Sequence, residues 1–197
     1  KCSSKPTRRA CAAVTRVFQY IYNTRDCQLI FSGDKVVITG YSDSDWAADK
    51  NSRKSRSGHI IYIGKGPVEW CSKLQPIVAN STAEAELIAI NRPARSILWM
   101  RWLLYQIGIQ SIITSRASIL FVDNAAALAI VKNPIYHDRT KHIAIKYFFA
   151  RELAENGVIM FEKIESAENI SDMNTKALGS IKFKYHRNRA MGGVVIY

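Results

Sequence analysis

Apolar residues recur along the chain with two different spacings, and the alternation between the two predicts a mixed α/β fold. Runs of β-branched and aromatic residues bounded by turn residues predict strands at 27–31, 36–43, 59–63, 67–71, 118–122 and 158–164. Apolar positions three and four residues apart predict helices at 6–23, 125–132, 140–155 and 168–178, and a long helix from residue 81. The first three strands of the main body suit an antiparallel meander, after which helical crossovers add parallel strands.

A few residues with strong local preferences set the predicted boundaries. Pro6 is expected in the first turn of the first helix, and Ser81 and Glu84 have the spacing of a capping box. Residues 64–67 are rich in glycine and proline and predict a hairpin connection. Pro93 interrupts the long helix, which is therefore expected to kink or split there at a cost of about 3 kcal/mol.

Acidic residues occupy comparable places in four of the predicted elements. Asp43 ends the first strand of the body, and because strand side chains alternate between faces, Asp43 and Asp45 point the same way. Glu86 borders the buried stripe of the long helix. Asp123 directly follows a strand, at the carboxyl end where open α/β sheets bind ligands. Asp172 lies in the first turns of the last predicted helix, where acids are common.

Each acid has an ordinary structural explanation when it is considered alone: a turn residue, a solvated helix residue or a first-turn residue. In a strongly basic chain, the four acids together indicate a site for two metal ions. Two magnesium ions held by carboxylates about 4 Å apart can activate a water and stabilise the leaving oxygen of a phosphodiester. Phosphodiester chemistry is therefore a hypothesis that depends on whether the acids converge.

The charge balance of the chain favours a polyanionic partner. The 197 residues suffice for one well-buried core, and 28 Lys and Arg against 16 Asp and Glu give a net charge of +12. Nucleic acid is the first candidate partner, an anionic membrane surface is the second, and a merely solvated basic surface is the alternative to both. No apolar run reaches the ~20 residues that span a bilayer. The chain starts at Lys1 without a leader pattern and is expected to be a fragment or a processed product.

Three basic clusters are candidates for phosphate contacts. They comprise Lys50, Arg53, Lys54 and Arg56, then Lys132, Arg139, Lys141 and Lys146, and finally Lys182, Lys184, Arg187 and Arg189. The first two adjoin the elements that carry acids, so phosphate contact is the preferred interpretation there, with a solvated face as the alternative. His137 and His142 lack metal-ligand spacing, which favours surface or substrate contacts. The four cysteines also lack zinc spacing and indicate isolated thiols in a reducing compartment.

Several of these stretches together resemble the ribonuclease H domain of copia-type LTR retrotransposon polyproteins. The motifs that carry the resemblance are Gly40-Tyr41-Ser42-Asp43-Ser44-Asp45-Trp46-Ala47, Arg53-Lys54-Ser55 with Ser57-Gly58, Ser81-Thr82-Ala83-Glu84-Ala85-Glu86, Val122-Asp123-Asn124, Lys132-Asn133-Pro134 with Arg139-Thr140-Lys141-His142-Ile143, and Asp172 with Thr175-Lys176. Their order and spacing match along nearly the whole chain. The N-terminal helix resembles the segment that joins reverse transcriptase to this domain.

The resemblance implies a ribonuclease H fold, an α/β five-stranded mixed sheet flanked by helices. It also implies endonucleolytic cleavage of the RNA strand of RNA–DNA hybrids to a 5′-phosphate and a 3′-hydroxyl. By motif match, the implied catalytic and metal-binding residues are Asp43, Glu86, Asp123 and Asp172, with two Mg²⁺ ions that Mn²⁺ can replace. The implied nucleic-acid contacts come from Arg53, Lys54, Asn124, Arg139, Lys141 and His142.

The resemblance also implies partners, a location and a division of the chain. The partners are the hybrid, which is read by its shape and 2′-hydroxyl groups, and the reverse transcriptase domain of the same polyprotein. No membrane contact is expected, and the location is intracellular, in cytoplasmic virus-like particles or in the nucleus. Residues 1–35 are the reverse transcriptase connection, residues 36–180 the ribonuclease H domain and residues 181–197 a basic C-terminal tail.

The chain departs from the family pattern in several places, none of which removes a proposed ligand. The departures are Arg56-Ser57-Gly58-His59, Lys73-Leu74, Asn174-Thr175-Lys176-Ala177-Leu178 and Pro93. One alternative is therefore a catalytically decayed or repurposed nucleic-acid-binding module of the same fold. A further alternative is an interaction domain that supports the polymerase through residues 1–35.

Overall fold

The computed structural model describes residues 6–32, 36–109, 116–132 and 144–192, without the side chains of residues 144–147. The described residues form two compact units, of which one extends to Leu29 and the other begins at Ile30. Each unit has its own internal arrangement.

The first unit consists mainly of helix α1 (Arg8–Asn23). Thr7 caps this helix, because its hydroxyl accepts a hydrogen bond from the backbone N–H of Ala10 at 3.1 Å. The predicted helix is confirmed, although Pro6 precedes the cap and does not enter the first turn. None of the side chains of α1 is buried.

The second unit is built on a five-stranded mixed sheet. Its strands are β1 (Ile38–Asp45), β2 (Arg56–Ile63), β3 (Gly66–Leu74), β4 (Ser118–Val122) and β5 (Ile159–Lys163). Their order is β3-β2-β1-β4-β5. The pairs β1–β2 and β2–β3 are antiparallel, whereas β1–β4 and β4–β5 are parallel. The predicted meander followed by parallel strands is therefore confirmed, since hairpins give antiparallel pairs and crossovers give parallel ones.

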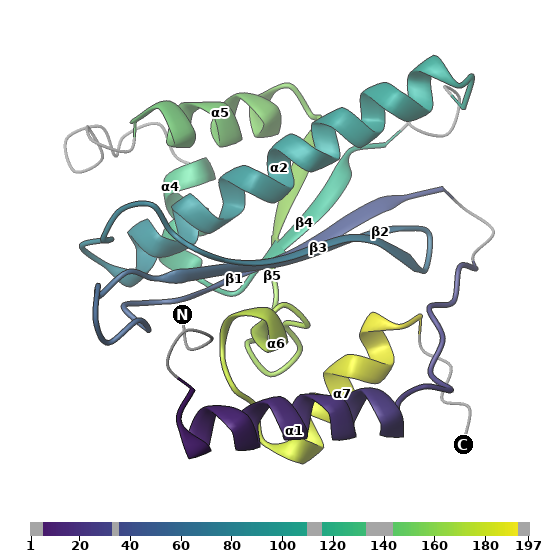
Figure 1. The fold of residues 1–197 in the computed structure, drawn as a ribbon. Helices are drawn as coiled ribbons and strands as arrows, with labels where there is room; N and C mark the ends of the chain where they lie inside the picture. The colour runs from purple at the N-terminus through teal and green to yellow at the C-terminus, as the bar shows by residue number, and fades with distance from the viewer. Residues whose placement is uncertain (1–5, 33–35, 110–115, 133–143, 193–197) are drawn as a thin grey trace. The chain divides into compact units, whose positions relative to one another are not determined.

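Helices cover both faces of this sheet. They are α2 (Thr82–Gln106), α4 (Ala125–Lys132), α5 (Ala144–Glu155), α6 (Asp172–Thr175) and α7 (Ser180–Ala190). Helices α2, α4 and α5 lie on one face, and α6 and α7 lie on the other (Figure 1). The larger part of the core lies between the sheet and the first group of helices.

Helix α2 runs through Pro93 without a break, so the predicted split does not occur. Ile90 on one side of the proline and Ala94 and Ile97 on the other are all completely buried in the same apolar cluster. Packing on the sheet therefore holds both halves of the helix against the same core. The stabilisation from that packing offsets the loss of the backbone hydrogen bond that proline cannot donate.

Two predicted elements near the ends of the chain are wrong. Residues 27–31 form no strand. The segment makes single backbone hydrogen bonds instead, from Ile30 N to Met191 O and from Cys27 N to Thr24 O, each at 3.0 Å. The helix predicted at 168–178 is only the single turn α6. Helix α7 then occupies much of the segment that was expected to be a basic tail.

The described residues beyond 180 belong to the second compact unit. The functional division of the chain at residues 35 and 180 remains a prediction. None of the helices in the described ranges is both long and apolar enough to cross a membrane.

Candidate metal centre

Two neighbouring parallel strands carry the first two candidate acids. The register of β1 and β4 places Ser42 opposite Val122, so the next residues of each strand, Asp43 and Asp123, lie beside each other. The Asp43 side chain is deeply buried, whereas Asp123 is half-buried. Both acids lie toward the carboxyl ends of parallel strands, the place where ligands bind to open α/β sheets.

The third acid, Glu86, comes from the second turn of α2, which packs on β1. Ser81 fixes the start of this helix, since its hydroxyl accepts a hydrogen bond from Glu84 N at 3.1 Å. Glu86 Oε1 accepts two hydrogen bonds from Ser44, one from the backbone N–H at 2.9 Å and one from the hydroxyl at 2.8 Å. The other oxygen, Oε2, is buried and accepts no hydrogen bond from any residue in the described ranges.

Asp43, Glu86 and Asp123 form an acidic triad in which one oxygen from each carboxylate lies within 4.8 Å of the others. Burial raises the pKa of Asp43 to about 6, and the nearby acids Asp172 and Asp123 add to the rise, against the opposing effects of Thr175 and Lys176. Burial also raises the pKa of Glu86 to about 8, and the negative charge of Asp43 adds to this rise. Burial and nearby negative charges both disfavour the ionised form of a carboxyl group.

The acidic triad fits a hard divalent cation. Mg²⁺ binds oxygen ligands and is commonly held in proteins by one or two carboxylates together with water. Its charge would offset the repulsion that raises the pKa values of Asp43 and Glu86. It would also give the buried Oε2 of Glu86 a partner, which the described part of the protein does not provide.

The fourth predicted ligand, Asp172, lies near this site but is held by lysines. Its carboxylate forms an ion pair with Lys176 Nζ at 2.8 Å and accepts a hydrogen bond from Lys182 Nζ at 2.6 Å. Lys176 Nζ also lies 3.6 Å from Asp43 Oδ2, so one ammonium group is shared between the two acids. Asp172 is therefore not part of the acidic triad, and its role as a metal ligand remains a prediction.

The segment around α6 supports Asp43 through contacts that the sequence did not reveal. The Thr175 hydroxyl donates a hydrogen bond to Asp43 Oδ2. This segment presses against Gly58 of β2, where an added Cβ would lie only 2.7 Å from Thr175 Cγ2. Thr175 and Lys176 belong to a recognised motif, but no local pattern reports a contact across 132 positions.

The structure describes three of the six residues that are predicted to contact nucleic acid. Arg53 and Lys54 lie in the loop after β1, which is closed by backbone hydrogen bonds from Arg53 N to Asp49 O at 2.7 Å and from Asp49 N to Lys54 O at 3.1 Å. Asn124 caps α4, since its side-chain oxygen accepts from Ala127 N at 2.9 Å. Arg139, Lys141 and His142 lie outside the described residues.

His59, a departure from the family pattern, is integrated into the fold. Its buried ring contacts Glu69 Oε1 at 3.0 Å. The same oxygen accepts a hydrogen bond from the Ser96 hydroxyl at 2.8 Å, so strands β2 and β3 are linked to α2. Burial lowers the pKa of His59, although the contact with Glu69 opposes this shift.

Comparisons with known proteins find similar sequences in retrovirus-related Pol polyproteins of plant transposons. It is 34% identical over 179 residues to a retrovirus-related Pol polyprotein from transposon TNT 1-94 of Nicotiana tabacum, and this match covers 91% of the chain and 13% of the relative. It is 32% identical over 180 residues to the corresponding polyprotein of transposon RE1 of Arabidopsis thaliana, over 91% of the chain and 12% of the relative. The chain therefore spans about an eighth of the length of these relatives. No family model matches the chain.

The fold is shared with solved ribonuclease H structures. One is LC11-RNase H1, isolated from compost by a metagenomic approach, which superposes with a TM-score of 0.51 at 17% identity. The match covers 71% of this chain and 93% of that protein. The predicted ribonuclease H fold is therefore confirmed.

Proposed function

Because the chain belongs to the copia-type retrotransposon Pol polyproteins and has the ribonuclease H fold, we propose that it is a metal-dependent endonuclease that cuts the RNA strand of RNA–DNA hybrids. The observation that carries this proposal is the acidic triad, in which Asp43 and Asp123 lie toward the ends of two parallel strands and Glu86 comes from α2. A net charge of +12 supports the proposal, because a basic surface attracts the phosphate backbone while the triad holds cations.

The proposed cofactor is Mg²⁺, as two ions that Mn²⁺ can replace. The acidic triad would provide the main ligands, and Asp172 would join it if Lys176 and Lys182 moved away. When bound, divalent metal activates water and stabilises the leaving oxygen of a phosphodiester. The chain's own residues orient the ligands: Ser44 fixes one oxygen of Glu86, and Thr175 fixes one oxygen of Asp43.

The proposed substrate contacts are the residues that the family motifs imply. Arg53, Lys54 and Asn124 would contact phosphate and sugar groups, together with Arg139, Lys141 and His142. Such contacts position a duplex without reading its sequence. In the longer polyprotein, the reverse transcriptase domain would be the partner that supplies the hybrid, and residues 1–35 would form the connection to it.

The test is cleavage of an RNA–DNA hybrid labelled on the RNA strand, measured in Mg²⁺, Mn²⁺ or EDTA. Asp123→Asn should lower the cleavage rate by at least roughly 100-fold, because several kcal/mol of metal-dependent charge stabilisation are lost. Asp45→Asn is the matched control, since Asp45 lies on β1 but outside the acidic triad, and it should cut at nearly the normal rate. Cleavage that persists in EDTA or in Asp123→Asn would refute the site assignment.

The same experiment tests the alternative of a non-catalytic binding module. Tight, salt-sensitive hybrid binding without cleavage in either metal would favour that module. Hybrid binding by Asp123→Asn, with cleavage lost, would favour the nuclease, because the substitution removes a metal ligand and leaves the basic surface intact.

A further inference from the structure

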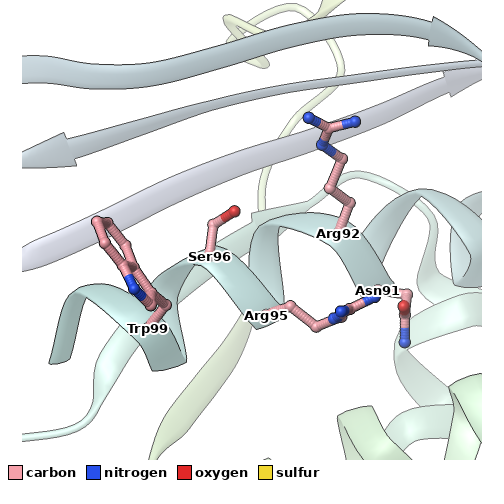
Figure 2. Close-up of a pocket in the computed structure, with 5 residues that line it drawn as sticks. All are labelled: Asn91, Arg92, Arg95, Ser96 and Trp99. Atoms are coloured by element: carbon pink, nitrogen blue, oxygen red, sulfur yellow. The ribbon is translucent and has the colours of Figure 1, made fainter. Parts of the chain in front are cut away.

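A second site lies on α2, beyond the acidic triad. The pocket has a volume of about 460 Å³ and is lined by Asn91, Arg92, Arg95, Ser96 and Trp99 (Figure 2). Arg92 follows Glu86 by six positions, which corresponds to about 9 Å along the helix. A pocket of this size falls within the range of small-ligand sites, and none of its lining residues belongs to the triad.

Two arginines give this pocket its charge. Arg92 and Arg95 are exposed, and neither makes a hydrogen bond or an ion pair with another residue in the described ranges. Glu69 contacts the pocket lining, but the same carboxylate oxygen already accepts a hydrogen bond from Ser96 at 2.8 Å and contacts His59 at 3.0 Å. The planar guanidinium groups, with five N–H donors each, match the geometry of a phosphate.

An aromatic surface adjoins the two guanidinium groups. Trp99 is 55% exposed and Trp102 is 57% exposed, and their spacing of three residues places them on the same side of the helix. Figure 2 shows the Trp99, Ser96 and Arg92 side chains pointing toward the side of α2 on which the strands lie, whereas Arg95 runs along the helix. Exposed indole rings beside free arginines combine the two features of single-strand binding sites, stacking surfaces and phosphate contacts.

We infer that this pocket binds one nucleotide unit of a single-stranded nucleic acid, with Arg92 and Arg95 on the phosphate and Trp99 stacked on the base. A duplex is a poorer occupant, because its bases are stacked on one another and present no free face to Trp99. The other possible occupant is a protein, since Trp, Tyr and Arg are also common in protein interfaces. Arg92 and Arg95, which pair with no acid among the described residues, and the excess positive charge of the chain favour a nucleic acid.

This inference does not depend on the nuclease activity. If the chain also cuts hybrids, the strand in this pocket would be a single-stranded tail that extends from the duplex. Binding can be measured in EDTA, where metal-dependent cleavage does not occur. Failure of this inference and failure of the proposed nuclease are therefore separate results.

The experiment measures fluorescence anisotropy of short labelled oligothymidylate and oligouridylate in EDTA at several salt concentrations. Arg92→Ala with Arg95→Ala should raise the Kd roughly tenfold or more and lower the salt dependence. The matched control is Arg8→Ala with Arg9→Ala, which removes the same charge from the exposed helix α1. Equal weakening by both double variants would overturn the inference, because it would show an effect of net charge alone.

Substitution of tryptophan tests the stacking contact. Trp99→Ala should raise the Kd roughly fivefold or more, whereas Trp70→Ala, which removes an equally exposed ring from β3, should change it little. Similar affinities for the DNA and RNA oligonucleotides are expected, because the proposed contacts involve phosphate and base. Two outcomes would overturn the inference. One is that Trp99→Ala weakens binding to a blunt duplex as much as it weakens binding to the single strands. The other is that the protein self-associates through Trp99 and binds no oligonucleotide.

Discussion

Replacing Glu86 with glutamine should remove most of the pH dependence of stability in the metal-free protein. Burial raises the pKa of Glu86 from 4.5 to about 8 in the folded protein. A carboxyl group with a raised pKa binds its proton more tightly in the folded state than in the unfolded state. Its contribution to stability is therefore complete below pH 4.5 and is lost as the pH rises through 8.

The size of this effect follows from the pKa of Glu86. A rise from 4.5 to about 8 corresponds to roughly 5 kcal/mol of unfolding free energy, a large part of the 5–15 kcal/mol that is typical of a folded domain. Asp43, with a pKa of about 6, contributes a smaller loss at lower pH. The amide introduced by Glu86→Gln would keep an acceptor for Ser44 and would never carry a charge.

The assay is denaturant unfolding in EDTA at pH 5.5, 7 and 8.5. The wild type should lose several kcal/mol over this range, and Glu86→Gln should lose less than half as much. Asp45→Asn, which lies outside the acidic triad, should behave like the wild type. Saturating Mg²⁺ at pH 8.5 should restore stability to the wild type and not to Glu86→Gln. Equal pH slopes in the wild type and Glu86→Gln would refute the reasoning.

Two further substitutions test the supports of the acidic triad. Ser44→Ala removes one of the two hydrogen bonds to Glu86 Oε1 and should weaken Mg²⁺ binding roughly tenfold, as measured by calorimetric titration; an unchanged affinity would show that the backbone N–H suffices. Gly58→Ala places a Cβ 2.7 Å from Thr175 Cγ2. This substitution should lower the free energy of unfolding by about 1–3 kcal/mol and should also lower the cleavage rate. A thermal melt equal to that of the wild type would contradict this close approach.

The elements of the central sheet could be predicted because local and tertiary preferences agree there. The apolar run of β4 predicts a strand with the observed bounds, Ser118–Val122. The three acids of the triad could be proposed because each follows or borders an element whose type was clear. Motif resemblance selected them from the other acids, and the parallel register of β1 and β4 then explains why Asp43 and Asp123 meet.

The errors lie where distant contacts decide the local structure. Helix α7 has a polar sequence and buries only His186 and Ala190. Ion pairs from Lys182 to Asp172 at 2.6 Å and from Arg189 to Glu168 at 2.5 Å attach it to the body, and no local pattern reports such pairs. The paired state of Asp172 was missed for the same reason.

The energetics of the triad bear on the choice between a nuclease and a non-catalytic binding module. Near neutral pH, metal-free Glu86 alone costs the fold several kcal/mol, because its buried carboxyl must either keep a proton or carry an uncompensated charge. Lys176 offsets only part of the charge of the triad, since its ammonium group lies closer to Asp172, at 2.8 Å, than to Asp43, at 3.6 Å. In a module that only bound nucleic acid, an uncharged residue in place of Glu86 would increase stability. The buried acids are understandable if a cation binds among them, and this favours the metal-dependent nuclease.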